Sequence, residues 1–244
     1  MRKLILDFGN TLQKLAVFEG HDMLDETVFS MITPDQVIEY VHRKGPFNAS
    51  ILSAVVDYPS EIKTFLERNM RFVELLDSTP IPITNNYRTP KTLGKDRIAA
   101  VVGAAALYPH TNILVIDAGT CITYDLISKT GDYPGGAISP GITMRFKAMN
   151  AFTGKLPLIE AEPFGSLVGK STKESMLSGV MNGTIEEIKG IIMRYQEQFE
   201  NLSIVITGGD HKYLLSKLKN NIFAVPNLVL RGLNEILEYN EKGS

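Results

Sequence analysis

Two stretches of the chain decide the fold: 4-LILDFGNT-11 and 114-LVIDAGTC-121. Each consists of a short apolar run, an Asp, one further residue, a Gly, and then small polar side chains or a thiol. The two aspartates, Asp7 and Asp117, are 110 positions apart, which is nearly half of the 244 residues. A second strand-like run follows each stretch, at 15–18 and 122–127. Each stretch is therefore predicted to form a β-hairpin that opens a domain.

The rest of the chain alternates helix and strand signals. Strands are expected over 51–56, 72–76 and 203–207. The glycine pairs 135–136 and 208–209 are expected to interrupt or turn the chain. Helices are expected over 37–42 with Thr33 as the cap, 62–67, 98–107, 142–152, one long helix from Met176 to Tyr195, and 228–239. This alternation predicts an α/β fold. A boundary near residue 112 divides the chain into domains 1–112 and 113–244.

The composition excludes several classes of protein. Hydrophobic residues make up 44% of the chain and charged residues 21%, which is typical of a globular protein. The formal net charge of −2 provides no positive field for nucleic acid, so none is expected as a partner. A single cysteine, Cys121, excludes an internal disulfide and favours a cytoplasmic location. The longest apolar stretch, 98–108, is too short to cross a bilayer, so a soluble protein without a membrane partner is expected.

Both hairpin turns have the residues of an anion site. Gly9 and Gly119 allow backbone N–H groups to approach an anion closely, and Asn10, Thr11 and Thr120 are short polar side chains. A single turn of this kind would be better explained as a hairpin stabilised by an Asx-type hydrogen bond. Two copies favour a pair of turns that bind one polyphosphate.

The aspartates of the two turns are candidate metal ligands. Asp7 and Asp117 could hold a hydrated Mg²⁺ between them. Thr123 and Asp125 follow the second turn at alternate positions and should share one face of the next strand. Neither a GxxxxGK[ST] loop nor a GxGxxG sequence with a suitable acid occurs in the chain. The pattern therefore indicates phosphoryl transfer without a P-loop.

The segment 87–97 is the most basic in the chain, with four cationic side chains and one acid, Asp96. An aspartate among cations stays ionised and could accept a proton from a substrate hydroxyl. Arg97 could bind a substrate carboxylate through two parallel hydrogen bonds. The alternative is a solvated loop in which Asp96 only caps the helix over 98–107, and composition alone favours that alternative.

Five motifs in this order and spacing resemble the type III pantothenate kinases, which belong to the sugar kinase, Hsp70 and actin superfamily. The resemblance extends from Met1 to about Gly232. The motifs are Asp7-x-Gly-Asn-Thr11, Tyr87-x-x-Pro-x-x-Leu-Gly94-x-Asp96-Arg97, Asp117-x-Gly-Thr120-x-x-Thr123-x-Asp125, Gly135-Gly136-x-Ile138-x-Pro140-Gly141 and Thr207-Gly208-Gly209.

The resemblance implies two similar ribonuclease H-like (actin-like ATPase) domains with an active-site cleft between them. The implied activity is the ATP-dependent phosphorylation of pantothenate to 4′-phosphopantothenate, the first step of coenzyme A biosynthesis. It also implies a homodimer that requires Mg²⁺ and a monovalent cation, K⁺ or NH₄⁺.

The resemblance assigns roles residue by residue. Asp96 matches the general base. The pantothenate site would comprise Asp96 with Tyr87, Gly94, Lys95, Arg97 and Thr172. The ATP site would comprise Asp7, Gly9, Asn10, Thr11, Asp117, Gly119, Thr120 and Thr123, with Gly208 and Gly209 at the adenosine. Mg²⁺ would bind Asp7 through water, Asp117 would bind Mg²⁺ or the monovalent cation, and Asp125 the monovalent cation.

One departure and two alternatives remain. The family places a histidine where this chain has Phe152, so one hydrogen bond to pantothenate is not expected. A sugar or other small-alcohol kinase of the same superfamily would share both phosphate turns, but a neutral sugar gives Arg97 no carboxylate to bind. A non-catalytic regulator of the same fold is the other alternative, and the retention of Asp96, Asp7 and Asp117 counts against it.

Overall fold

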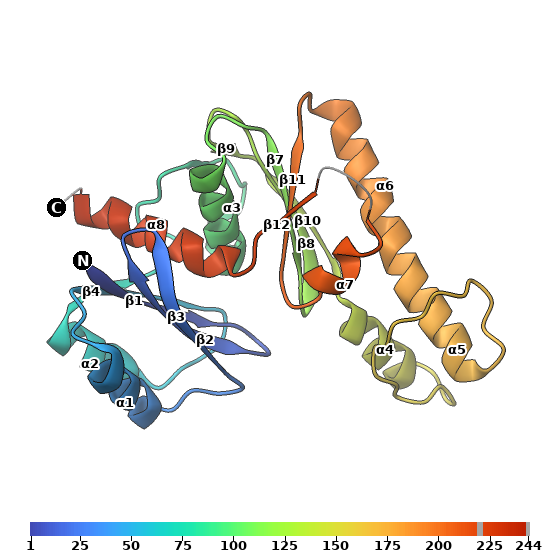
Figure 1. Cartoon of the computed structure of the whole chain (residues 1–244), viewed down its shortest axis with the longest axis horizontal. Helices are drawn as coiled ribbons and strands as arrows, with labels where there is room; N and C mark the ends of the chain where they lie inside the picture. Colours follow the sequence, from blue (N-terminus) through green and yellow to red (C-terminus); the bar gives the residue numbers. More distant parts are fainter. Residues whose placement is uncertain (219–221, 243–244) are drawn as a thin grey trace. The chain divides into compact units, whose positions relative to one another are not determined.

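A computed structural model describes residues 1–218 and 222–242 of the chain (Figure 1). The chain forms two compact units. Unit 1 comprises Met1–His110, Thr130–Pro134 and the chain from Asn227 onward, and unit 2 comprises Thr111–Lys129 and Gly135–Pro226.

Unit 1 is built on a five-stranded sheet of order β3-β2-β1-β4-β5. Strands β1, β2 and β3 are antiparallel neighbours, whereas β4 and β5 run parallel to β1. Its elements are β1 (Arg2–Phe8), β2 (Gln13–Glu19), β3 (Asp22–Phe29), α1 (Pro34–Lys44), β4 (Ala49–Ala54), α2 (Ser60–Asn69), β5 (Arg71–Glu74), β6 (Thr84–Asn85), the 3₁₀ helix η1 (Pro90–Thr92), α3 (Lys95–Leu107), β9 (Asp132–Tyr133) and α8 (Leu228–Lys242).

Unit 2 repeats this plan with the sheet order β10-β8-β7-β11-β12. Strands β7, β8 and β10 are antiparallel neighbours, and β11 and β12 run parallel to β7. Its elements are β7 (Ile113–Ala118), β8 (Cys121–Ile127), β10 (Gly135–Pro140), α4 (Ile142–Ala151), α5 (Thr172–Leu177), the π-helical turn η2 (Ser178–Asn182), α6 (Gly183–Gln198), β11 (Ser203–Thr207), α7 (His211–Leu215) and β12 (Ile222–Ala224).

The internal repeat extends to burial. Residues 2–10 and 112–120 show the same succession of buried, half-buried and exposed side chains. Four successive buried residues lead to a half-buried aspartate, Asp7 or Asp117, because each strand lies inside its sheet and is covered on both faces. The predicted α/β fold with two similar domains is confirmed.

Helices cover both faces of the unit 1 sheet (Figure 1). On one face, Leu4 and Leu6 of β1 pack in a cluster with residues of α1 and α2 such as Val37 and Leu66. Helix α1 begins as predicted, because Thr33 and Gln36 form a reciprocal capping box. On the other face lie α3 and α8, which contact each other more extensively than any other pair of elements.

Helices α3 and α8 cross at two glycines. A Cβ atom on Gly103 would lie 2.7 Å from the carbonyl oxygen of Leu228, and one on Gly232 would clash with the carbonyl of Ala99. The two backbones therefore touch, which only glycine allows at these positions. This crossing fixes the position of α3, the helix whose first turn contains Asp96.

The structure corrects the sequence analysis at four places. The predicted second domain, 113–244, differs from unit 2, because α8 packs on α3 and the chain from Asn227 onward therefore belongs to unit 1. Residues 219–221 and 243–244 of the predicted domain lie outside the described residues. Strand β3 was not expected. Gly135 and Gly136 do not interrupt the chain but begin β10, where the backbone of Gly136 lies against Tyr124. The predicted long helix contains the π-helical turn η2.

Candidate active site

The first predicted phosphate turn joins β1 to β2 in unit 1. Asp7 is half-buried near the end of β1, opposite Lys14 in the antiparallel register. The N–H of Gly9 donates to the carbonyl of Leu12 at 3.1 Å, which closes a four-residue turn. Asn10 and Thr11 are exposed in this turn. Short polar side chains are thus presented to solvent beside a carboxylate, as an anion site with a metal requires.

The second predicted phosphate turn joins β7 to β8 in unit 2. It is tighter than the first, with two residues between the strands, and the N–H of Gly119 donates to the carbonyl of Cys121 at 2.9 Å. Asp117 is half-buried and pairs with Thr123 in the register, so these two predicted ligands are neighbours. Asp125 is fully buried farther along β8.

The predicted adenosine motif lies beside the second turn. Strand β11 runs parallel to β7 and pairs Thr207 with Asp117, so Gly208 follows at the same edge of the sheet. Gly208 has a φ of +90°, and a Cβ atom there would lie 2.5 Å from Oδ1 of Asp117. A Cβ atom on Gly209 would meet nothing within 4 Å. The two glycines therefore differ: Gly208 allows the close approach of two strands, and Gly209 borders open space.

Asp210 lies directly after the glycine pair, at the same edge of the sheet. The sequence analysis did not identify it. Its backbone N–H donates to the carbonyl of Ala118 at 3.0 Å, which connects the glycine pair to the end of β7. Burial raises the pKa of its carboxyl group. A polar residue directly after a predicted glycine turn was the signal that could have identified it.

A half-buried polar network supports the second turn from α4 and α6. Arg145 donates to the carbonyl of Pro140 at 2.9 Å and to Glu187 at 2.5 Å. The neighbouring N–H of Gly141 donates to the carbonyl of Thr120 at 3.1 Å, within the phosphate turn. Arg145 therefore fixes the segment that holds the turn in place.

Glu187 is the anionic centre of this network. Burial alone would raise its pKa, but hydrogen bonds from Arg145, Ser139 and Tyr124 outweigh burial and hold the pKa below its usual value. The hydroxyl of Tyr124 donates at 3.0 Å, and burial together with the charge of Glu187 raises the pKa of this phenol. The network thus keeps a carboxylate ionised inside unit 2.

The predicted pantothenate loop lies in unit 1 and leads into α3. Gly94 is the N-cap of α3, and Asp96 lies in the first turn, half-buried, with its Oδ1 accepting the backbone N–H of Arg97 at 2.9 Å. Asp96 thus lies two residues after the N-cap position, but its side chain still satisfies one backbone N–H group of the first turn. Lys95 is half-buried beside it.

Arg97 and Tyr87 form the other part of this loop. Arg97 is only 5% exposed, and its guanidinium carbon lies 5.7 Å from the centre of the Tyr87 ring. On the other side, Tyr87 stacks on Tyr133 of β9, with ring centres 6.2 Å apart. The strand pair β6–β9 fixes this stack, because the N–H of Asn86 donates to the carbonyl of Tyr133 at 2.9 Å. A buried cation, an aromatic ring and a carboxylate are thus gathered at the start of α3.

The sequence model of the type III pantothenate kinase family matches residues 3–194. The chain belongs to the type III pantothenate kinase family. It is 46% identical over 239 residues to the type III pantothenate kinase of Christiangramia forsetii, covering 98% of each chain. It is 43% identical over 240 residues to that of Phocaeicola vulgatus, covering 98% of this chain and 99% of the relative.

Solved structures with low sequence identity share the fold. A glucokinase from an Antarctic psychrotroph matches with a TM-score of 0.53 and 13% identity, covering 98% of this chain and 99% of that chain. A conserved Campylobacter jejuni protein, suggested to be a Baf family transcriptional activator, matches with a TM-score of 0.60 and 21% identity, covering 98% and 99%. The resemblance drawn from the five motifs is confirmed, and the chain is an ATP-using kinase of the pantothenate kinase class.

Two further positions of the type III pantothenate kinase pattern lie in unit 2. Thr172 is the exposed first residue of α5, whose N-cap Ser171 accepts the backbone N–H of Glu174 at 3.2 Å. Phe152, which replaces the family's histidine, ends α4 and is 88% exposed. The roles predicted for individual residues stay predictions, but within each unit the structure gathers them as the motifs require.

Proposed function

We propose that this chain transfers the γ-phosphoryl group of ATP to the 4′-hydroxyl of pantothenate, which opens coenzyme A biosynthesis. Membership of the family supports the reaction class. The observation that carries the substrate assignment is the buried Arg97 beside Asp96 at the start of α3. A cation that is buried and oriented by an aromatic ring suits a substrate with a carboxylate group. Pantothenate has a carboxylate, whereas a neutral sugar has none.

In this proposal both phosphate turns bind the same ATP molecule. Gly9, Asn10 and Thr11 of one turn and Gly119, Thr120 and Thr123 of the other bind its phosphates. Gly208 and Gly209 border the adenosine, where the open space beside Gly209 leaves room for a nucleotide. Most of the rate acceleration then comes from positioning and charge neutralisation, because phosphoryl transfer requires little covalent chemistry from the protein.

The carboxylates of the turns fit the metal ions that the family resemblance implies. Asp7 and Asp117 are half-buried at strand ends and offer the oxygen ligands that Mg²⁺ prefers, with room for bound water. Bound Mg²⁺ would neutralise charge on the phosphates. For the monovalent cation, K⁺ or NH₄⁺, Asp117 and the fully buried Asp125 are the proposed anionic groups.

Asp96 is proposed to orient the 4′-hydroxyl and to accept its proton. Its Oδ1 already accepts the N–H of Arg97, so the carboxylate is held in one orientation. Arg97 binds the pantothenate carboxylate, with Tyr87, Gly94, Lys95 and Thr172 completing the pocket. Phe152 supplies no hydrogen bond, so the carboxylate contact carries a larger share of the binding than in relatives with a histidine.

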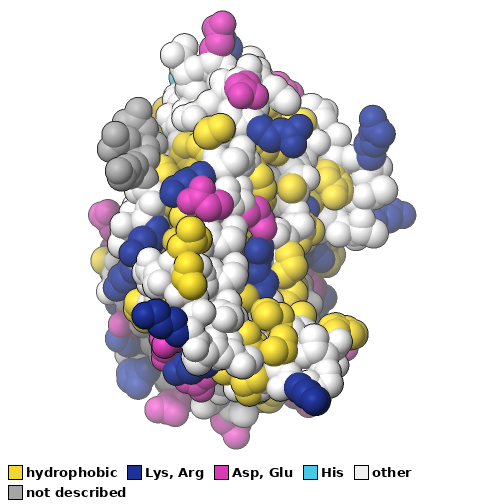
Figure 2. Space-filling view, turned by 90° about the vertical axis from the view of Figure 1, so that its right-hand side faces the viewer, with side chains coloured by type: hydrophobic (Ala, Val, Ile, Leu, Met, Phe, Trp, Pro, Cys, Tyr) yellow, Lys and Arg dark blue, Asp and Glu magenta, His cyan; other side chains and the backbone are white. Residues whose placement is uncertain are grey.

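The proposal includes a homodimer and a cytoplasmic location. Several apolar side chains of the segment 152–168 are exposed, such as Phe152 at 88% and Leu167 at 81%. Figure 2 views the molecule from the side of α6 and shows hydrophobic side chains lying among charged ones. These exposed apolar side chains are the proposed contribution of this segment to a dimer interface. Among the described residues, the structure contains no helix long and apolar enough to cross a bilayer.

One assay tests the proposal and its alternatives. The protein is incubated with ATP, Mg²⁺ and K⁺ and with pantothenate, pantetheine or a panel of sugars, and the phosphorylated product is identified by mass spectrometry. We expect 4′-phosphopantothenate. Phosphorylation of a sugar alone would establish the small-alcohol kinase alternative. Absence of any product, with ATP bound, would establish the non-catalytic regulator.

A further inference from the structure

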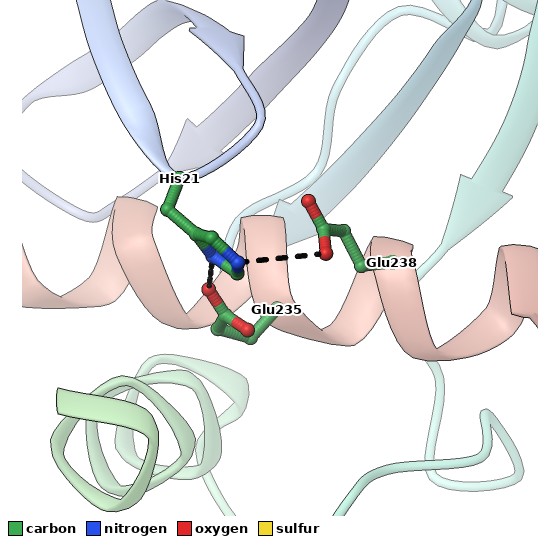
Figure 3. A group of neighbouring side chains, drawn as sticks. All are labelled: His21, Glu235 and Glu238. Atoms are coloured by element: carbon green, nitrogen blue, oxygen red, sulfur yellow. Dashed lines mark hydrogen bonds and ion pairs between the residues drawn. The ribbon is translucent and has the colours of Figure 1, made fainter. Parts of the chain in front are cut away.

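A second cluster of metal-ligating side chains lies in unit 1, at the opposite end of the first hairpin from Asp7. His21 occupies the β2–β3 turn, and Glu235 and Glu238 lie one helical turn apart on α8 (Figure 3). Their ligand atoms all lie within 4.8 Å of one another. Nδ1 of His21 is 2.7 Å from Oε1 of Glu235, and Nε2 is 4.0 Å from Oε2 of Glu238. One imidazole and two carboxylates thus converge on one small region.

Hydrogen bonds from neighbouring residues hold Glu238 and the turn that carries His21 in place. Lys3, itself 2% exposed, binds Oε1 of Glu238 and leaves Oε2 facing the histidine. Asn234 is 1% exposed; it accepts from Lys3 at 3.2 Å and donates to the carbonyl of Gly20 at 3.1 Å. The turn that presents His21 is therefore fixed to the helix that presents the glutamates. Neighbours that hold metal ligands in a fixed orientation raise the affinity of a site for its metal.

The exposure of the cluster makes it accessible to a cation from solution. Lys3 and Lys242 both pair with Glu238, whereas Glu235 pairs with His21. The side chain of Lys242 is 81% exposed and its Nζ lies 3.9 Å from Oε2 of Glu238, so a bound cation would displace only this long contact. The side chain of His21 is 72% exposed, whereas those of Glu235 and Glu238 are 21% and 15% exposed. A cavity of about 180 Å³, partly lined by His21 and Glu235, borders the cluster. Water can therefore complete the coordination of an ion from one side.

We propose that His21, Glu235 and Glu238 bind a divalent transition metal ion, with Zn²⁺ as the preferred ion and water as the remaining ligand. Imidazole and carboxylate together suit Zn²⁺ better than Mg²⁺, which favours oxygen ligands alone. Zn–N and Zn–O bonds of about 2.0–2.2 Å place tetrahedral ligand atoms about 3.4 Å apart. Only one ring nitrogen of His21 can bind the ion, so the exposed imidazole must rotate until that nitrogen lies about 3.4 Å from a carboxylate oxygen of both Glu235 and Glu238. One ligand atom from each of the three residues already lies within 4.8 Å of the other two.

Metal binding at this position would join residues that are far apart in the sequence. The ion connects the N-terminal hairpin to the C-terminal helix, so it stabilises unit 1 and takes no part in phosphoryl transfer. Because binding to the folded state alone stabilises a protein, Zn²⁺ should raise the unfolding temperature of the whole protein in a saturable manner.

The test is Zn²⁺ titration of the full-length protein by calorimetry, with excess Mg²⁺ present to occupy the carboxylates of the phosphate turns. We expect one site in the wild-type protein. His21→Ala and Glu235→Gln should each weaken binding by more than the roughly 10- to 100-fold that outer-shell changes cause. Glu241→Gln, on the same helix but outside the cluster, is the control. Its affinity for Zn²⁺ should stay within about twofold of the wild-type affinity, well below the change expected for the loss of a ligand.

A second readout separates metal binding from folding. Without Zn²⁺, His21→Ala and Glu235→Gln should unfold near the wild-type temperature. His21 is mostly exposed, and glutamine at position 235 can still form a hydrogen bond to it. Only the wild-type protein and Glu241→Gln should gain stability when Zn²⁺ is added. Addition of Co²⁺ instead should produce a visible absorption band in these two proteins and none in His21→Ala or Glu235→Gln. Equal Zn²⁺ affinity in His21→Ala and the wild type, or no binding in the wild type, would overturn the proposal.

Discussion

The guanidinium group of Arg97 lies over the ring of Tyr87, with Cζ 5.7 Å from the ring centre. This cation–π contact occurs where Arg97 is 5% exposed, so the charge is both desolvated and oriented. Tyr87 is in turn stacked on Tyr133, which belongs to the short strand β9. In the folded protein, Arg97 and Tyr87 of this basic segment are therefore held by packing and ring contacts and are not part of a solvated loop.

Arg97→Met should lower kcat/KM for pantothenate by roughly tenfold to a hundredfold, since a hydrogen-bonded charge is worth about 1.5–3 kcal/mol. It should affect pantothenyl alcohol much less, because that analogue has no carboxylate. Steady-state kinetics with both substrates measures the difference. Arg88→Met, in the same loop but exposed, is the matched control and should leave both values unchanged. An equal loss for the two substrates would show that Arg97 does not bind the carboxylate.

Asp96→Asn should lower kcat by about 10² to 10⁴ while pantothenate binding and folding are retained. The amide oxygen of asparagine can still accept the backbone N–H of Arg97, so the first turn of α3 keeps its hydrogen bond. Kinetics, substrate titration and thermal unfolding of the same preparation check this. Asp77→Asn, an exposed position, serves as the control. A variant with wild-type kcat would exclude Asp96 as the base.

Asp7→Ala and Asp117→Ala should each severely reduce kcat, and the double variant should be little worse than either single one. Groups that act as one unit show such non-additive losses. The measurement is a double-mutant cycle on kcat, with Asp22→Ala on the exposed start of β3 as the control. Losses that multiply would mean that the two turns serve separate sites.

The two glycines of the adenosine motif should respond differently to valine. Gly209→Val should fold normally and raise KM for ATP much more than KM for pantothenate, because a side chain there enters open space. Gly208→Val should instead lower the unfolding temperature, because φ is +90° and the new Cβ would meet Ala118 and Asp117. Thermal unfolding measured beside ATP kinetics distinguishes them. A destabilised Gly209→Val protein with unchanged KM for ATP would contradict the nucleotide assignment.

Glu187→Gln should flatten the acid side of the stability profile. The pKa of Glu187 is lowered in the folded protein, so its contribution to stability is present above the unfolded pKa of about 4.3 and is lost as the pH falls through the lower folded value. The unfolding temperature of the wild type should therefore fall more steeply below about pH 5 than that of the variant. Glu186→Gln, exposed on the same helix, should keep the wild-type profile.

Local signals in the sequence were sufficient for the two hairpins and most helices. Thr33 and Gln36 form the helix cap that their types predict, and the repeated aspartates lie at equivalent strand ends. These features depend on residues that are neighbours in the chain. Short-range hydrogen bonds and apolar patterning explain them fully.

Features that depend on distant partners could not be predicted in the same way. Strand β3 contains Asp25 and Glu26, which disfavour a strand by type but are paired with Lys44 and Lys14 of other elements. The sequence analysis predicted an interruption at Gly136. In the folded sheet this glycine instead allows β10 to approach the backbone of Tyr124 closely, and that requirement cannot be recognised from neighbouring residues. The packing of α8 against α3 in unit 1 likewise depends on Gly103 and Gly232, which are far apart in the sequence.

The crossing of α3 and α8 has a consequence for the order of events during synthesis. Strand β1 of unit 1 precedes every element of unit 2 in the chain, yet one face of its sheet is covered by α8, which is translated after every element of unit 2. Until Gly232 emerges, α3 lacks the surface against which it packs, and the apolar residues of this face remain exposed to water. Helix α3, and with it the segment 87–97 that leads into it, therefore reaches its folded surroundings only after unit 2 has been translated.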